Sequence, residues 1–218
     1  MSANPLPLKI YFIRHGETAW SLSGRHTGRT DLPLTPHGEA MARALAPALQ
    51  GIPFSRVLSS PRLRARTTCQ LAGFGPANVE LAPDLAEWDY GDYEGLRTAD
   101  IRQQHPAWDV WQDGCPNGET PAAVSARADR LIAGLISDDH PNDLDGGNGP
   151  SRNIMAFSHG QFGRALAARW IGLPVMQGQH FAIGPASISI LGFEADHPER
   201  RVIALWNATG SIKQGASR

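Results

Sequence analysis

Two short apolar runs of this chain each end in a histidine followed by a glycine, and this repetition constrains the fold more than any other feature. The run 8–13 leads into Arg14 and His15, and the run 153–157 leads to His159. Short runs rich in β-branched and aromatic residues are typical of buried strands. In α/β sheets, ligands bind at the carboxyl ends of the strands. We therefore expect both histidines to face one pocket, although either His-Gly pair alone would be ordinary on a protein surface.

Helical patterns alternate with the strand-like runs. Three helices are expected to begin where a serine or threonine precedes a proline, at Thr35, Ser60 and Thr120, because such pairs combine a side-chain cap with a residue favoured in the first turn. Pro47 should kink or shorten the first of them, and a fourth helix follows Gly160. Further strand-like patterns cover residues 54–58, 187–193 and 202–206. This alternation predicts an α/β fold, a three-layer α/β/α sandwich around a mostly parallel mixed sheet.

The chain is expected to form a single domain over residues 1–218, because its length suffices for one substantial core and no linker divides it. Residues 84–118 differ from the rest: they are rich in Trp, Asp, Gly and Pro and have weak periodicity. We interpret them as a partly helical insertion beside the active site, and residues 137–153 as a polar connecting loop. The aromatic residues of the insertion are expected to form its own core, with one or two facing a ligand: Trp88, Tyr90, Tyr93, Trp108 and Trp111.

Charge and cysteine content exclude several classes of protein. Lys and Arg total 20 against 21 Asp and Glu, a net charge of −1, so the chain has no global attraction to nucleic acid or to an anionic membrane. No run has the length of a membrane span, and the amino terminus lacks the pattern of a signal peptide. Cys69 and Cys115 have no metal-ligand spacing and are expected to be reduced thiols. We expect a cytoplasmic protein without nucleic-acid or membrane partners, and the sequence leaves the oligomeric state open.

The reactive side chains suit phosphoryl transfer. Arg14 and His15, an arginine-rich helix start after Pro61, Glu87 and His159 all fall at strand ends or in the loop expected to cover them. A phosphoryl group in transfer spreads its charge over three oxygens and is stabilised by fixed cations, and an arginine can bind two of those oxygens at once. A neutral imidazole can attack phosphorus, and a carboxylic acid can protonate the leaving oxygen.

In their order along the chain, these motifs resemble the histidine phosphatase superfamily, also called the phosphoglycerate mutase-like family. The resemblance is carried by Arg14-His15-Gly16-Glu17-Thr18, residues 27–35, Ser59-Ser60-Pro61 with Arg64-Ala65, Glu87 with residues 91–95, Gly118-Glu119-Thr120 and Ser158-His159-Gly160. It implies a phosphoglycerate mutase-like fold in which His15 is the nucleophile that becomes phosphorylated and Glu87 is the proton donor. Arg14, Arg64 and His159 would complete the phosphate pocket.

The same resemblance implies the rest of the substrate site, and it implies neither a metal nor a cofactor. The residues that would line the site are Thr18, Ser21, Thr27, Gly28, Gly160 and Gln161. Many relatives carry asparagine where this chain has Ser21, whose hydroxyl can still donate to a phosphate oxygen with a shorter reach.

Several neighbouring residues have simpler interpretations. Arg62 and Arg66 share a helical turn with Arg64 and are expected to be solvated surface charges. Glu94 is the alternative acid, but its flanking tyrosine and glycine indicate a structural role, so Glu87 is preferred. The other histidines lack a partner at ligand spacing and are interpreted as ordinary loop residues: His26, His37, His105, His140, His180 and His197.

Three functions follow from this resemblance. The first is a phosphatase that hydrolyses a small phosphorylated metabolite through phosphorylated His15. The second is a cofactor-dependent phosphoglycerate mutase, which is disfavoured because residues 85–88 and 96–98 differ from the mutase pattern. The third is a catalytically silent phospho-ligand binding protein, which should have lost the nucleophile or the acid.

Residues around positions 20, 62, 88 and 112 also resemble sedoheptulose-1,7-bisphosphatase-type members of the family. That resemblance favours a sugar phosphate or bisphosphate as substrate. Arg62, Arg97 and Arg164 are the candidates for holding a second phosphate.

Overall fold

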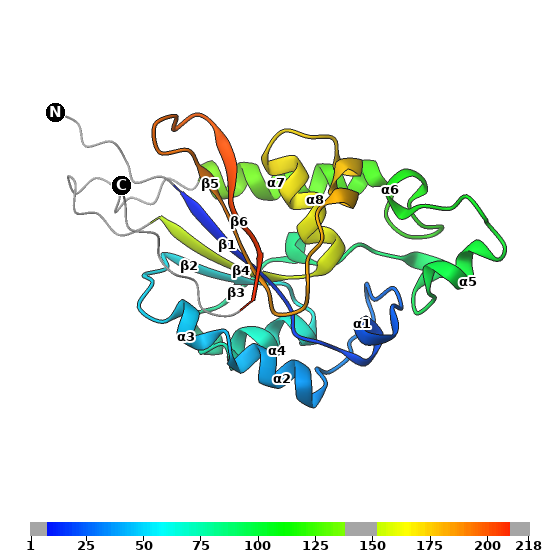
Figure 1. The fold of residues 1–218 in the computed structure, drawn as a ribbon, viewed down its shortest axis with the longest axis horizontal. Coiled ribbons are helices and arrows are strands. Elements are labelled where there is room, and N and C mark those ends of the chain that lie inside the picture. Colours follow the sequence, from blue (N-terminus) through cyan, green and yellow to red (C-terminus); the bar gives the residue numbers. More distant parts are fainter. Residues whose placement is uncertain (1–7, 138–151, 210–218) are drawn as a thin grey trace.

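Six strands form one mixed sheet in the order β3-β2-β4-β1-β5-β6 among residues 8–137 and 152–209, the part of the chain described by this computed structural model (Figure 1). The strands are β1 (Lys9–Arg14), β2 (Arg56–Ser59), β3 (Glu80–Leu81), β4 (Asn153–Ser158), β5 (Ile188–Phe193) and β6 (Arg201–Ala208). Strands β3, β2, β4 and β1 run parallel, whereas β5 and β6 are antiparallel to their neighbours. The predicted mostly parallel mixed sheet is confirmed.

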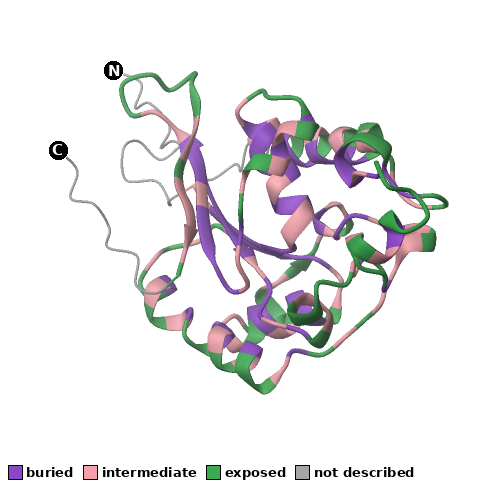
Figure 2. Cartoon of the chain, turned by 45° about the vertical axis from the view of Figure 1, so that its right-hand side comes forward, coloured by how far each residue is buried: buried purple, intermediate pink, exposed green. Residues whose placement is uncertain are grey.

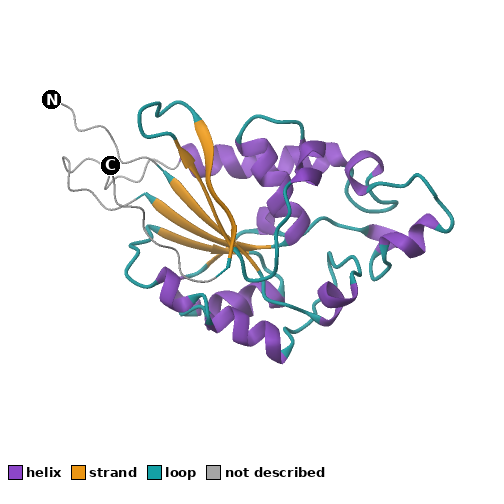
Figure 3. Cartoon of the chain, in the orientation of Figure 1, coloured by secondary structure: helices purple, strands orange, loops and turns teal. Residues whose placement is uncertain are grey.

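Three helices cover one face of the sheet (Figure 3). They are α2 (Pro36–Arg43), α3 (Ala46–Leu49) and α4 (Leu63–Leu71). Thr35 caps α2 as predicted, since its side chain accepts a hydrogen bond from the N–H of Gly38. The chain leaves α2 before Pro47 and restarts as α3, because a proline is compatible with the first turn of a helix but not with its interior. Between these helices and the sheet lies an apolar core that includes Ile13 and Phe157.

The other face is covered by α7 (Pro121–Ser137) and α8 (Gly160–Trp170), which completes the predicted three layers. The apolar residues that recur at helical spacing along α7 are buried: Val124, Ala128, Leu131, Ile132 and Leu135. The central strands of the sheet and the inner faces of both helices form the buried interior of the molecule (Figure 2). Gly163 brings α8 close to β1, because a Cβ at this position would overlap the ring of Phe12.

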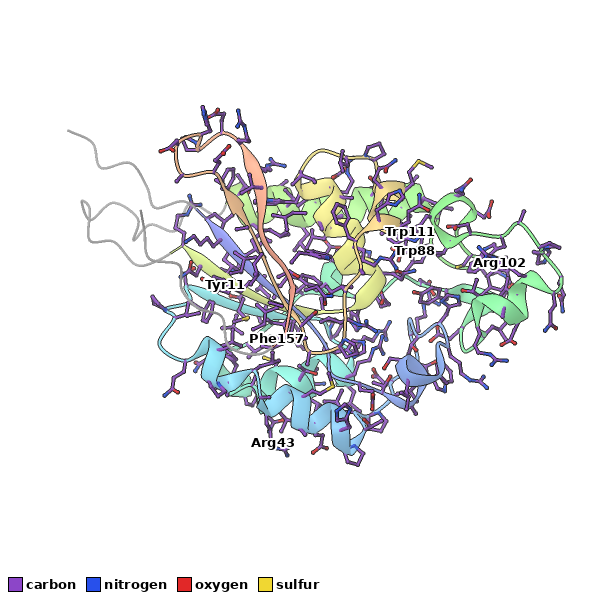
Figure 4. All side chains as sticks on the ribbon, viewed as in Figure 1. Tyr11, Arg43, Trp88, Arg102, Trp111 and Phe157 are labelled. Atoms are coloured by element: carbon purple, nitrogen blue, oxygen red, sulfur yellow. The ribbon has the colours of Figure 1, made fainter. Side chains whose placement is uncertain are left out.

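The remaining segments are short. They comprise α1 (Ala19–Ser23), η1 (Pro76–Asn78), η2 (Pro83–Leu85), η3 (Gly91–Tyr93), α5 (Thr98–Arg102), α6 (Val110–Asp113) and η5 (Val175–His180). Three of them, η3, α5 and α6, lie wholly in the partly helical stretch 84–118. The aromatic residues of this stretch do not form a core of their own, because Trp88, Tyr90, Trp108 and Trp111 belong to the apolar cluster shared with the sheet, α7 and α8. Figure 4 shows Trp88 and Trp111 together where this stretch meets α7 and α8. Their ring centroids are 5.5 Å apart. Of the predicted loop 137–153, residues 138–151 lie outside the described part. No helix in the described ranges has both the length and the apolar character needed to cross a bilayer.

Candidate active site

The parallel pairing of β1 with β4 brings the two predicted histidines together. Arg14 pairs with Ser158 at the carboxyl ends of these strands, and the N–H of His15 donates to the Ser158 carbonyl at 2.9 Å. One residue beyond this pairing, the rings of His15 and His159 meet edge to face with centroids 5.2 Å apart. Two side chains 144 positions apart in sequence (159 − 15) therefore share one site.

His15 is held as a neutral imidazole with one free nitrogen. Its Nδ1 lies 2.7 Å from the carbonyl oxygen of Gly16. A carbonyl only accepts hydrogen bonds, so Nδ1 carries the proton and Nε2 keeps its lone pair. Burial, followed by the charges of Arg64 and Arg14, lowers the pKa of His15 well below 6.5. The unprotonated ring required of a nucleophile is therefore maintained in mildly acidic solution.

His159 is fixed as the opposite tautomer. The guanidinium Nε–H of Arg64 donates to its Nδ1 at 3.2 Å, so the ring proton sits on Nε2, which donates to the Ser60 hydroxyl at 2.7 Å. Both His159 and Arg64 have no exposed surface. Arg64 also donates to three carbonyl oxygens of residues 27, 28 and 30. Burial, and next the charge of Arg64, lowers the pKa of His159 well below 6.5.

Arg14 retains hydrogen-bonding capacity for an anion. Its Nη1 donates to the Ile183 carbonyl at 2.6 Å, whereas its buried Nε has no partner. An unpaired buried donor is costly unless a ligand satisfies it. Gly160 makes room for this guanidinium, because a Cβ there would lie 3.2 Å from Arg14 Nε. Burial lowers the pKa of Arg14, and the charge of Glu87 opposes that shift.

Glu87 sits at the amino terminus of α8. Its Oε1 accepts from the N–H groups of Trp88 at 2.9 Å and Phe162 at 2.7 Å, and its Oε2 accepts from the N–H of Gln161 at 3.0 Å. A carboxyl oxygen has two lone-pair sites, so Oε1 is saturated and Oε2 has one site left. The proton of a carboxylic acid at position 87 therefore belongs on Oε2.

A cleft of about 220 Å³ connects these groups. Of the predicted residues, Arg14, His15, Ser21, Thr27, Glu87, Gly160 and Gln161 line it, together with six others: Gly24, Arg25, His26, Tyr90, Arg164 and Ile183. Arg64 and His159 are not among its lining residues; they lie in the buried layer that contacts His15. Apart from Arg164, which was considered for a second phosphate, and Tyr90, one of the aromatic candidates, these additional lining residues carry no local sequence signal.

Two predicted substrate residues, Thr18 and Gly28, do not line the cleft. Thr18 caps α1, since its Oγ1 accepts from the N–H of Ser21 at 3.1 Å. Gly28 packs closely, because a Cβ there would lie 2.6 Å from the Trp88 carbonyl oxygen. Ser21 lines the cleft, but its Oγ donates to the Thr18 carbonyl at 3.0 Å and accepts from the Thr18 N–H at 2.9 Å. Its single hydroxyl proton is therefore occupied within the capping box.

Glu94, the alternative acid, lies outside the cleft lining. Its carboxylate accepts from the N–H of Gly28 at 2.9 Å and of Thr30 at 3.0 Å. It thereby joins the stretch 84–118 to the loop that follows α1. Within the described ranges, no three His, Cys, Asp or Glu side chains are grouped closely enough to hold a metal ion.

The three arginines considered for a second phosphate lie in different surroundings. Arg97 is exposed and forms an ion pair with Asp100 at 2.8 Å. Arg62 donates to the carbonyl of Arg29 at 3.1 Å, away from the cleft lining. Arg164 alone lines the cleft, where it donates to Gln161 Oε1 at 2.6 Å. Arg25, which sequence reasoning missed, also lines the cleft.

Comparison with known proteins agrees with the motif order. A family model described as "Histidine phosphatase superfamily (branch 1)" matches residues 10–209. The chain belongs to this superfamily. An acid phosphatase of Mycobacterium tuberculosis is 43% identical over 209 residues, covering 95% of this chain and 97% of the relative. A sedoheptulose 1,7-bisphosphatase of Saccharomyces cerevisiae is 37% identical over 191 residues, covering 78% and 69% of the two chains.

Histidine phosphatase folds are also found among solved structures. The structure of an open reading frame product of Mycobacterium tuberculosis superposes with a TM-score of 0.81 at 40% identity, covering 93% of this chain and 98% of that one. The predicted phosphoglycerate mutase-like architecture is thereby confirmed.

Proposed function

We propose that this protein is a phosphatase, a phosphoric monoester hydrolase that acts on a small phosphorylated metabolite through phosphorylated His15. This proposal rests mainly on one observation: the same cleft is lined by His15, whose Nε2 is free, and by Glu87, whose Oε2 has an unused lone-pair site. The phosphatase names of the relatives support the same reaction class. We also propose that residues 1–218 form a single domain, that the protein is cytoplasmic, and that the reaction does not require a metal ion.

In the first step, the lone pair of His15 Nε2 attacks phosphorus, and the bond from phosphorus to the leaving oxygen breaks as the N–P bond forms. The proton on Glu87 Oε2 moves to that oxygen, so the product leaves as a neutral alcohol. Arg14 supplies its unpartnered Nε–H to the phosphoryl oxygens. Arg64 and His159 complete the pocket beside His15, where the charge of Arg64 helps keep the nucleophile neutral by lowering its pKa.

In the second step, Glu87 is a carboxylate and takes a proton from water. The water oxygen attacks phosphorus, the N–P bond breaks, and inorganic phosphate and neutral His15 are released. Glu87 thereby regains the proton that it gave up, so the cycle needs no further reactant. The cationic charge for the transferred group comes from arginine, which supports a reaction without metal.

We propose that the preferred substrate carries a second anionic group, as a sugar bisphosphate does. Arg25 and Arg164 both line the cleft that contains His15. Arg25 makes one side-chain hydrogen bond, to the Gly95 carbonyl at 2.8 Å, and is exposed. Arg164 is more firmly placed, with its guanidinium 5.0 Å from the ring centroid of Trp111. Two cations in addition to Arg14 in the same cleft favour a ligand with more than one anionic group.

A hydrolysis panel tests the reaction and the substrate class together. It contains sugar monophosphates, the matching bisphosphates, and 3-phosphoglycerate with and without 2,3-bisphosphoglycerate. Phosphate release, with more activity on bisphosphates, is expected; isomerisation of phosphoglycerate without phosphate release would make the protein a mutase. Arg25→Ala should lower kcat/KM for bisphosphates roughly tenfold and leave monophosphates unchanged. Arg43→Ala is the matched control, because Arg43 is an exposed arginine on α2 that pairs with Glu39.

Glu87→Gln tests the proton donor. It should lower kcat roughly 100- to 10,000-fold, the usual contribution of general acid–base catalysis. Binding of inorganic vanadate, which needs no proton transfer, should change little. Unchanged turnover at every pH would remove Glu87 from the mechanism.

A further inference from the structure

The segment that carries Glu87 has no regular structure of its own. Residues 86–90 follow η2 without belonging to a helix or strand. Irregular segments are more mobile than helices and strands unless other groups hold them. Proton transfer needs the acid within hydrogen-bonding distance of the leaving oxygen. Something outside the segment must therefore fix Glu87.

Arg127 of α7 binds the backbone on the amino-terminal side of Glu87. Its Nη1 donates to the carbonyls of Asp84 at 2.9 Å and Ala86 at 2.7 Å, and its Nη2 approaches the carbonyl of Glu87 at 3.4 Å. Arg127 is only 8% exposed. Hydrogen bonds from a buried charged donor are stronger than those between neutral groups. The backbone immediately before Glu87 is thus tied to a long helix.

Glu119 binds the residues on the carboxyl-terminal side of Glu87. It forms a two-pronged ion pair with Arg127, in which Nε–Oε1 is 2.9 Å and Nη2–Oε2 is 2.7 Å. Its Oε2 also accepts from the N–H of Asp89 at 3.0 Å, and its carbonyl accepts from Trp88 Nε1 at 3.0 Å. One side-chain pair therefore contacts the backbone on both sides of Glu87.

The same arginine contacts the helix that receives the Glu87 carboxylate. The Arg127 guanidinium lies 4.3 Å from the ring centroid of Phe162, and the N–H of Phe162 donates to Glu87 Oε1. Helices α7 and α8 pack against each other on this face of the sheet (Figure 1). Arg127 thus sets the acid-bearing segment against the amino terminus of α8.

We infer that Arg127 and Glu119 form a clamp that positions Glu87 for proton transfer to the leaving group. Both are positioning residues, since neither lines the cleft. The inference rests on the proposed role of Glu87. It also gives a role to the Gly118-Glu119-Thr120 motif that the phosphate chemistry leaves unused. The side-chain hydrogen bonds of the pair go to the backbone of residues 84–89 and to each other, so loss of the clamp should spare the nucleophile and the phosphate-binding cation.

Leaving-group dependence separates this role from a general structural one. An alkoxide is a strong base and needs its proton as the bond to phosphorus breaks, whereas p-nitrophenolate is a stable anion that leaves without one. Since kcat/KM reports the phosphorylation step, a misplaced acid lowers it for an alkyl phosphate much more than for p-nitrophenyl phosphate. Damage to folding or to the phosphate pocket lowers both equally.

The experiment measures kcat/KM for p-nitrophenyl phosphate and for the alkyl phosphate that the wild-type enzyme hydrolyses best. Arg127→Lys and Glu119→Gln should lower the alkyl value roughly 10- to 100-fold, lower the p-nitrophenyl value less than about threefold, and leave vanadate binding unchanged. Arg130→Ala is the matched control, because Arg130 lies one turn further along α7, is exposed, and pairs with the side chain of Asp84 at 3.0 Å. It should change both values less than twofold.

Each result decides one proposal. Equal losses on both substrates, or no loss, in a folded clamp variant would overturn the clamp. If Arg127→Lys does not fold, Glu119→Gln alone decides, because it keeps an acceptor oxygen and removes only the charge. Glu87→Gln is measured in the same series. If Glu87→Gln does not lower kcat/KM for the alkyl phosphate more than for p-nitrophenyl phosphate, the proposed role of Glu87 is wrong. If Glu87→Gln shows this difference and the clamp variants do not, only the clamp proposal is wrong.

Discussion

His26 should make the stability of this protein sensitive to mild acid. Its ring stacks on Tyr90 with centroids 4.5 Å apart and meets Trp108 edge to face at 5.5 Å. Its backbone hydrogen-bonds with Leu96 and Gly95, which joins the loop after α1 to the stretch 84–118. Burial lowers the pKa of His26 from 6.5 to about 4, with the charge of Glu94 in partial opposition.

The magnitude follows from proton binding in the two states. The folded-state pKa lies below the unfolded-state value, so the unfolded chain binds more protons between these values. Stability is therefore unaffected by this group above about pH 6.5 and falls as the pH drops toward 4. The full loss is about 3 kcal/mol, of which about 2 kcal/mol falls between pH 7.5 and pH 5.

Urea unfolding between pH 5 and 7.5, followed by tryptophan fluorescence, measures this loss in the wild type and in His26→Phe. Phenylalanine keeps a ring against Tyr90 and cannot titrate. It loses the contact of His26 Nε2 with Thr98 Oγ1 at 3.3 Å, a cost that does not depend on pH in this range. The buried His15 and His159 titrate in both proteins and cancel. The wild type should lose about 2 kcal/mol more than the variant, and parallel curves would refute the reasoning.

Three further predictions concern the nucleophile, the packing of α8 and the binding of a second anionic group. His15→Ala should abolish turnover in a folded protein. Because burial and Arg64 lower the pKa of His15, the kcat/KM of the wild type should not fall tenfold per pH unit just below pH 6.5. Such a fall in a pH–rate profile would contradict the assignment of His15 as the nucleophile. Gly163→Ala should destabilise the folded protein by about 1–3 kcal/mol, because the new methyl group overlaps with Phe12. Gly134→Ala, with open space around the new Cβ, should stabilise it by about 1 kcal/mol. Calorimetry of both variants checks that the two changes in stability have opposite signs. Arg97→Ala should leave the rate of bisphosphate hydrolysis within twofold of wild type, because Arg97 pairs with Asp100 and does not line the cleft. A loss as large as that expected for Arg25→Ala would show that Arg97 contributes to binding of the second anionic group.

The fold was largely predictable, because its signals are local. Caps and prolines predicted the starts of α2 and α7. The start predicted at Ser60-Pro61 was wrong by two residues, because α4 begins at Leu63 after Arg62, which makes no side-chain cap. Short elements were not predictable. Strand β3 has two residues, too few for an alternating pattern, and α1 is capped by a Thr18–Ser21 box instead of the more recognisable acidic one.

The chemistry of the site could be predicted from the sequence. Two strand ends that each carry a His-Gly pair, with two arginines and one carboxyl group in the family order, indicate phosphoryl transfer without any coordinates. That information is local because it depends on which residue types follow which strands, and a parallel sheet necessarily brings those strand ends to one edge.

The atoms that act, and the groups that surround them, depend on how the chain packs. The free Nε2 of His15 and the open Oε2 of Glu87 follow from hydrogen bonds to backbone groups, which no side-chain pattern records. The position of Arg25 in the cleft depends on how residues 84–118 are held against the rest of the chain, because Arg25 donates to the Gly95 carbonyl and Glu94 and Arg127 hold this stretch. Such contacts join residues dozens of positions apart, so their geometry exists only after the layers have packed.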